Sequence, residues 1–95
     1  MINLKKSIII YNPNSGKNSK EKTLPKLKEV LNDYNYEVEI IETKKKGHAT
    51  TLVKEVPYVD LLISIGGDGT FNEAMTGNFA RKKKINPMSS SIRNN

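Results

Sequence analysis

The fold is decided by residues 61–73, which read LLISIGGDGTFNE. An apolar, strand-like run leads into three glycines around Asp68, and Thr70 follows where a helix can begin. Glycine lets the backbone turn tightly and approach a ligand closely, and the unpaired N–H groups at the start of a helix favour an anion. This order of elements predicts a strand, a turn that fits a phosphate group, and a helix start.

Asp68 is the unusual residue in this turn, because a carboxylate repels a bare anion. Its presence makes sense if Mg²⁺ lies between it and the phosphates, or if it accepts a proton or a hydrogen bond. The alternative is a plain tight turn without a ligand. The stretch is not a Walker loop, because the Gly-Lys-Ser/Thr ending is absent.

A second strand-and-loop pair lies near the N-terminus. Residues 7–11, SIIIY, are typical of a fully buried strand, and residues 12–17, NPNSGK, consist largely of turn formers. In this loop Asn12 and Ser15 offer hydrogen bonds, Gly16 permits close approach and Lys17 offers a cation. An ordinary strand-to-helix turn remains the alternative.

The rest of the chain alternates between the two kinds of element. Apolar spacing predicts a helix through residues 24–34, begun by a cap at Ser19 or Thr23, and a short helix over residues 49–56. Strands are predicted at residues 36–42 and 59–65. The helix from Thr70 is expected to end at Gly77.

This order predicts an α/β fold, a three-layer sandwich with a parallel sheet in the order β-α-β-α-β-α. The loops at residues 12–17, at Thr43 and at residues 66–70 then lie at the same edge of the sheet, where such folds bind ligands. Their convergence favours a nucleotide site more strongly than any single motif does.

Composition narrows the classes of function. The chain has 95 residues, 36% of them hydrophobic, no cysteine and a single histidine, so we expect one domain without a disulfide framework or a histidine metal site. No apolar run is long enough to span a membrane. A cytoplasmic protein is therefore expected, and His48 is interpreted as a solvated loop residue rather than a catalytic one.

The net charge of +6 favours anionic partners. Basic residues gather at 44–46 and at 81–84, and each cluster is interpreted either as a solvated loop or as an attraction to an acidic membrane surface. Neither cluster has interleaved aromatic residues, so no specific nucleic-acid partner is expected. Residues 1–80 are predicted to form the domain and residues 81–95 a disordered tail. Open sheet edges favour homo-oligomers.

Two motifs, residues 11–17 (YNPNSGK) and residues 66–73 (GGDGTFNE), resemble those of the diacylglycerol kinase catalytic domain family, as do Glu42-Thr43 and Gly47-His48-Ala49. The resemblance covers residues 7–77 and implies an ATP site. It implies that Asp68 acts through Mg²⁺ and that Glu73 supports the loop. The implied nucleotide-binding residues are Asn12, Pro13, Asn14, Ser15, Gly16, Thr43, Gly66, Gly67, Asp68, Gly69, Thr70, Phe71, Asn72 and Glu73.

The reaction implied is transfer of the ATP γ-phosphoryl group to the hydroxyl of diacylglycerol or a related lipid, at an anionic membrane surface in the full-length protein. Members of the family continue into a second, β-rich domain with the distal base, and this chain resembles only their first part. We therefore expect no catalytic residue in it and no turnover by it alone. A non-catalytic nucleotide- or phosphate-binding module and an NAD-kinase-like enzyme are the alternatives.

Overall fold

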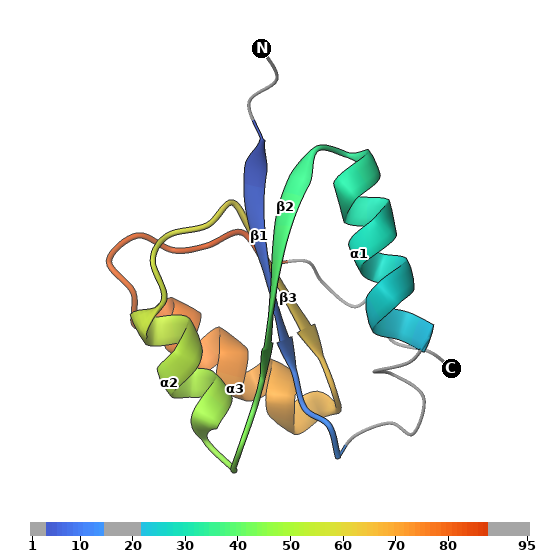
Figure 1. Cartoon of the computed structure of the whole chain (residues 1–95). Helices are drawn as coiled ribbons and strands as arrows, with labels where there is room; N and C mark the ends of the chain where they lie inside the picture. The colour runs from blue at the N-terminus through green and yellow to red at the C-terminus, as the bar shows by residue number, and fades with distance from the viewer. Residues whose placement is uncertain (1–3, 15–21, 88–95) are drawn as a thin grey trace.

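Three parallel strands form the middle layer of the computed structural model, which describes residues 4–14 and 22–87 (Figure 1). Strand β1 (Lys5–Tyr11) lies between β2 (Tyr36–Glu42) and β3 (Leu61–Ile65), so the sheet order is β2-β1-β3. In the register, Ile9 is opposite both Ile40 and Ile63. Parallel pairing on both sides of β1 brings the carboxyl ends of all three strands to one edge, at the bottom of Figure 1.

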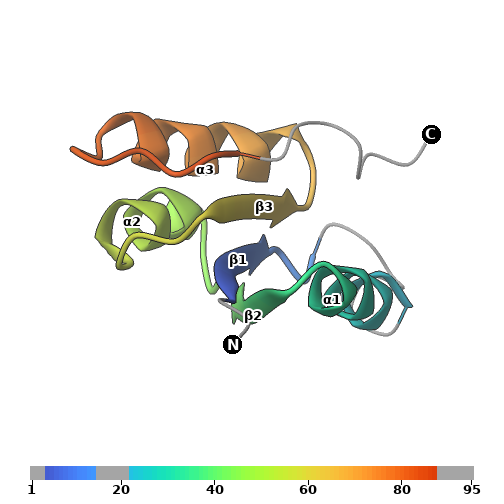
Figure 2. The ribbon, with the colours of Figure 1, turned by 90° about the horizontal axis from the view of Figure 1, so that it is seen from above.

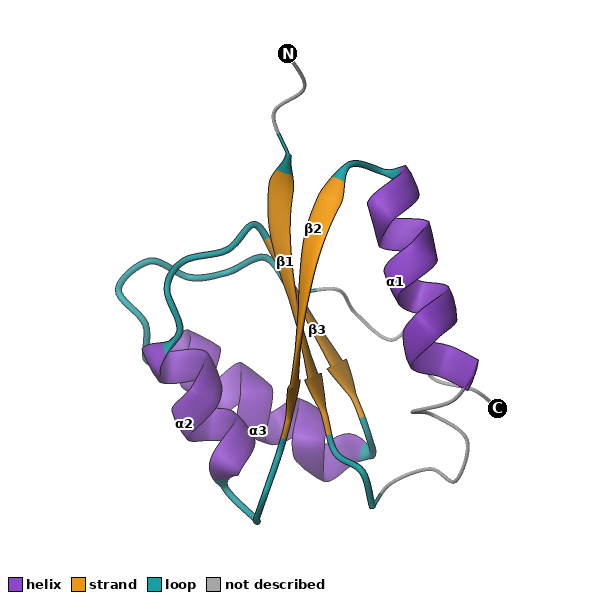
Figure 3. Ribbon diagram, in the orientation of Figure 1, coloured by secondary structure: helices purple, strands orange, loops and turns teal. Residues whose placement is uncertain are grey.

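Helices supply the crossovers that parallel strands require. Helix α1 (Leu24–Asp33) covers one face of the sheet, while α2 (His48–Glu55) and α3 (Asp68–Phe79) cover the other (Figure 2). The predicted three-layer α/β sandwich is therefore confirmed, as the view coloured by secondary structure also shows (Figure 3). Among the described residues, no helix combines the length and hydrophobicity needed to span a membrane.

The apolar run in β1 supplies both halves of the core, because successive side chains of a strand point to opposite faces. Ile8 and Ile10 pack on the side of α2 and α3 with Ala49, Val53, Leu62, Ala74 and Ile85. Ile9 and Tyr11 pack on the side of α1 with Leu24, Leu31, Ile63 and Ile65. The central strand is thus buried on both faces, which explains its continuous hydrophobicity.

The bounds of the helices differ slightly from the predictions. Helix α1 begins after Thr23 and carries Pro25 in its first turn, where a missing N–H costs nothing. Ser19, the other candidate cap, lies outside the described residues. Helix α3 begins at Asp68, two residues before the predicted start at Thr70.

The sequence predicts that Gly77 ends the third helix, but in the structure Gly77 lies inside α3. The helix continues to Phe79, and Gly77 is buried against α2. A Cβ atom at this position would overlap the carbonyl oxygen of Thr50. The hydroxyl of Thr50 in turn donates to the carbonyl oxygen of Glu73 at 2.8 Å, so α2 and α3 approach closely along this line. The glycine is there for packing rather than for helix termination.

Residues 81–87, the first part of the tail predicted to be disordered, make defined contacts with the rest of the domain. The Arg81 guanidinium donates to the carbonyl oxygens of Val53 at 2.8 Å and Val56 at 2.6 Å, which lie at the end of α2. Ile85 is buried, and its backbone N–H and C=O both bond to the side chain of Asn78. Hydrogen bonds of Arg81 and Asn78 and one buried side chain, Ile85, hold this segment in place. Its low hydrophobicity therefore did not predict these contacts. Residues 88–95 lie outside the described residues.

The same segment brings aromatic rings to the second basic cluster. Lys83 Nζ lies 4.3 Å from the centroid of the Tyr58 ring, and Lys84 Nζ lies 5.5 Å from that of Phe79. Both are within the range of a cation–π interaction. Residues 81–84 contain no aromatic residue, and the fold brings Tyr58 and Phe79 beside the lysines of this cluster.

We expect Gly77→Ala to lower the free energy of unfolding by about 1–3 kcal/mol, because the new methyl group forces α2 and α3 apart. Gly69→Ala is the matched control in the same helix, since a Cβ at Gly69 meets nothing within 4 Å. Denaturant unfolding followed by circular dichroism measures both. Equal stabilities of the two variants would contradict the packing role of Gly77.

Candidate functional site

The candidate site lies at the carboxyl ends of β1 and β3, where the chain leaves the sheet towards opposite faces. The chain leaves β1 towards α1 on one face, and it leaves β3 towards α3 on the other face (Figure 2). The two strands are neighbours, so their loops diverge and leave a crevice between the carboxyl ends. In open α/β sheets this switch point is where ligands bind.

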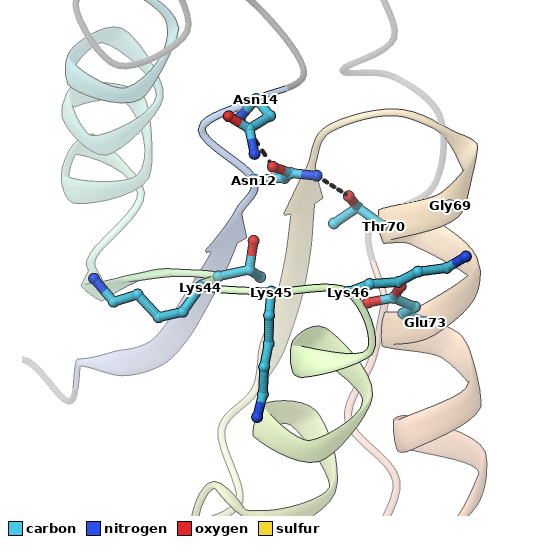
Figure 4. A pocket seen from close by; sticks show the side chains of 9 residues that line it. Asn12, Asn14, Lys44, Lys45, Lys46, Gly69, Thr70 and Glu73 are labelled. Carbon is cyan, nitrogen blue, oxygen red and sulfur yellow. Dashed lines mark hydrogen bonds between the residues drawn. The ribbon is translucent and has the colours of Figure 1, made fainter.

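Asn12 joins the two loops across the crevice (Figure 4). Its backbone N–H donates to the Ile65 carbonyl oxygen at 3.0 Å, and its side-chain Nδ2 donates to Thr70 Oγ1 at 3.2 Å. Its Oδ1 accepts the backbone N–H of Asn14 at 2.9 Å, which closes the turn after β1. Thr70 is buried at this contact. A single side chain therefore couples two motifs that are 58 residues apart.

A hollow of about 340 Å³ opens beside this contact. Its wall on the β2 side begins with Thr43, which is buried and whose N–H donates to the Tyr11 carbonyl oxygen at 2.8 Å. The loops after β1 and β2 and the first two turns of α3 contribute to it. The lining residues are Asn12, Asn14, Thr43, Lys44, Lys45, Lys46, Gly69, Thr70 and Glu73.

Six of the predicted nucleotide-binding residues therefore surround one space: Asn12, Asn14, Thr43, Gly69, Thr70 and Glu73. The other described candidates lie in the same loops or in the start of α3 but do not line the hollow: Pro13, Gly66, Gly67, Asp68, Phe71 and Asn72. Ser15 and Gly16 lie outside the described residues. The segments that follow the three strands thus converge on one space in the structure.

The sequence analysis did not place Lys44, Lys45 and Lys46 at the nucleotide site, but all three line the hollow. Their side chains are exposed, and the loop that carries them forms the wall opposite Asn12 and Thr70 (Figure 4). Lys44 Nζ lies 3.9 Å from Glu42 Oε1, an exposed pair that contributes little to stability. Their position directly after the second strand was the available signal, since parallel strands end at a common edge.

Asp68 lies in the first turn of α3, exposed to solvent and next to the positive end of the helix. Gly66 precedes it with φ of 156°, an angle that residues with a side chain rarely adopt. Within residues 4–14 and 22–87, no three acidic or histidine side chains gather closely enough to hold a metal ion. A metal bound at Asp68 would therefore take its other ligands from groups other than acidic or histidine side chains of the described residues, such as phosphate oxygens, carbonyl oxygens or water.

Comparison with known proteins identifies the family. The profile of the diacylglycerol kinase catalytic domain matches residues 6–89, which is most of the chain. This chain belongs to the diacylglycerol kinase catalytic domain family. The match extends over residues 81–87, the segment that the fold holds in place.

Individual relatives support the same family assignment. The chain is 43% identical over 76 residues to a diacylglycerol kinase of Staphylococcus saprophyticus and 40% identical over 75 residues to one of Staphylococcus aureus strain RF122; both alignments cover 77% of this chain. A solved diacylglycerol kinase structure from Bacillus anthracis strain Sterne superposes with a TM-score of 0.73 at 28% identity, over 92% of this chain and 32% of the other. The chain spans about a quarter of the length of the curated relatives, 25% and 24%.

We expect the contact between Asn12 and Thr70 to be worth about 0.5–1.5 kcal/mol, as a single hydrogen bond typically is. A double-mutant cycle with Asn12→Ala and Thr70→Val measures this coupling from the free energies of unfolding. Asn14→Ala is the control, because the bond to Asn12 uses only the Asn14 backbone. A coupling energy near zero would show that the two loops do not depend on each other through this contact.

Proposed function

We propose that this chain forms the nucleotide-binding part of a lipid kinase that transfers the γ-phosphoryl group of ATP to a hydroxyl of diacylglycerol or a related lipid. Membership of the diacylglycerol kinase catalytic domain family supports the reaction class. The observation that carries the proposal is the hydrogen bond from Asn12 to Thr70 at the switch point, because it joins both family motifs beside one hollow.

The hollow has the size and chemistry of a nucleotide site. Its volume of about 340 Å³ is within the range of small-molecule sites. Its lining residues carry amide, hydroxyl and ammonium groups, which can supply the hydrogen-bond donors and positive charge that a triphosphate needs. The glycine turn before α3 lets the backbone approach the phosphates, and the N-terminus of α3 favours their charge.

Mg²⁺ fits this arrangement as a partner of the nucleotide rather than as a resident of the protein. It commonly binds through one or two carboxylates together with phosphate oxygens and water. Asp68 offers one exposed carboxylate at the glycine turn, and no larger acidic group surrounds it among the described residues. When bound, Mg²⁺ would neutralise phosphate charge during transfer. Asp68 would hold and orient the metal-bound phosphates.

The lipid acceptor is proposed from the family and from charge. The net charge of +6 favours the anionic membrane surface where such a lipid lies. We place no catalytic residue in this chain, which provides the donor side of the reaction. Its contribution to catalysis is to position the phosphates and to stabilise their charge.

We expect the chain to bind MgATP in calorimetric titration, and Asp68→Asn to weaken that binding by about 10-fold or more, as loss of a charged contact does. In EDTA the two proteins should differ much less, because without the metal Asp68 has no bridging partner. Asp33→Asn makes the same change of charge at the far end of α1 and is the control.

Two results would count against the proposal. Absence of MgATP binding by the unmodified chain at millimolar nucleotide would overturn the nucleotide site. An equal loss of affinity in Asp68→Asn with and without Mg²⁺ would leave the site intact but remove the metal from the role of Asp68.

A further inference from the structure

His48 closes the turn that forms the β2 side of the hollow. Its ring Nδ1 accepts the backbone N–H of Lys44 at 2.8 Å, and its own backbone N–H donates to the Lys45 carbonyl oxygen at 3.1 Å. Between these bonds Gly47 has φ of 84°, which reverses the chain into α2. The side chain of the first residue of α2 therefore reaches back and fixes the loop before it.

The fixed loop is a wall of the proposed nucleotide site. The N–H of Thr43 is held by the Tyr11 carbonyl oxygen at one end, and His48 holds the N–H of Lys44 at the next residue. Two consecutive backbone groups are thus tied, one to the sheet and one to α2. Without the bond from Lys44, the turn keeps the bond from the His48 N–H to the Lys45 carbonyl oxygen, but the Lys44 amide loses its acceptor.

The charge of this wall indicates what it binds. Three lysines line the hollow together with a single acidic residue, Glu73. Only Lys44 has an ion-pair partner among the described residues, and its partner, Glu42, is exposed. Lys45 and Lys46 remain available to a ligand with several negative charges. A nucleoside triphosphate matches this wall better than a nucleoside monophosphate does.

We propose that His48 is a positioning residue of the nucleotide site, which holds the Thr43–Lys46 turn so that its cations face the polyphosphate of the ligand. This inference rests on the proposed function. It assigns to His48 a role that does not require contact with the nucleotide. The ring accepts at Nδ1, so it is the tautomer with its proton on Nε2 that holds the turn.

The test compares a variant that removes the acceptor with one that keeps it. His48→Leu has no acceptor, whereas His48→Asn places its side-chain oxygen one bond beyond Cγ, where Nδ1 lies in histidine. We expect His48→Leu to weaken MgATP binding by about 3- to 10-fold, the value of one hydrogen bond, and AMP binding by less than about twofold. His48→Asn should stay within about twofold of the unmodified chain for both ligands. His48→Ala gives the same test if His48→Leu does not fold.

Hydrogen exchange of the Lys44 amide, measured by NMR, follows the turn without any ligand. We expect faster exchange in His48→Leu and protection close to that of the unmodified chain in His48→Asn. Equal loss of ATP and AMP affinity, or failure of His48→Asn to restore ATP affinity, would overturn the positioning role. If the unmodified chain bound no MgATP, the proposed function itself would be overturned, and the Lys44 exchange would still report whether His48 holds the turn.

Discussion

Parallel pairing of β1 with both of its neighbours is the constraint on which the rest of this structure depends. Parallel strands cannot be joined by tight turns, so each must be followed by a helix that returns the chain to the opposite edge. The helices then cover both faces, and the central strand needs apolar side chains on both sides, which Ile8, Ile9 and Ile10 provide. All three loops at the carboxyl edge are consequences of this pairing.

The proposed nucleotide site of this chain is built from segments that the scaffold brings together. These segments follow three separate strands, and single side chains hold two of the contacts: Asn12 joins the loop after β1 to the first turn of α3, and His48 fixes the loop after β2 to α2. Because a rigid sheet determines where each loop begins, a few such bonds are enough to shape a hollow. This division between scaffold and loop is common in α/β proteins.

Much of the fold was accessible from sequence because its signals are local. Alternating apolar runs and turn formers predicted the strand and helix order, and the motif at residues 66–73 predicted the turn into α3. Gly77 was misinterpreted because a glycine near the end of a helix has the same local signature whether it ends the helix or admits a neighbour. The contacts of residues 81–87 were not predicted because Arg81 bonds to the Val53 carbonyl oxygen, which is distant in the sequence, and Ile85 bonds to Asn78 inside α3.

The sequence by itself determined the strand and helix order, the parallel sheet and the two motifs of the diacylglycerol kinase catalytic domain family. These follow from periodicity and from residue types that act over a few neighbouring positions. Only the tertiary structure decided that Asn12 bonds to Thr70 and that the three lysines line the hollow. Such contacts depend on register and on the packing distance between helices, which no local pattern encodes.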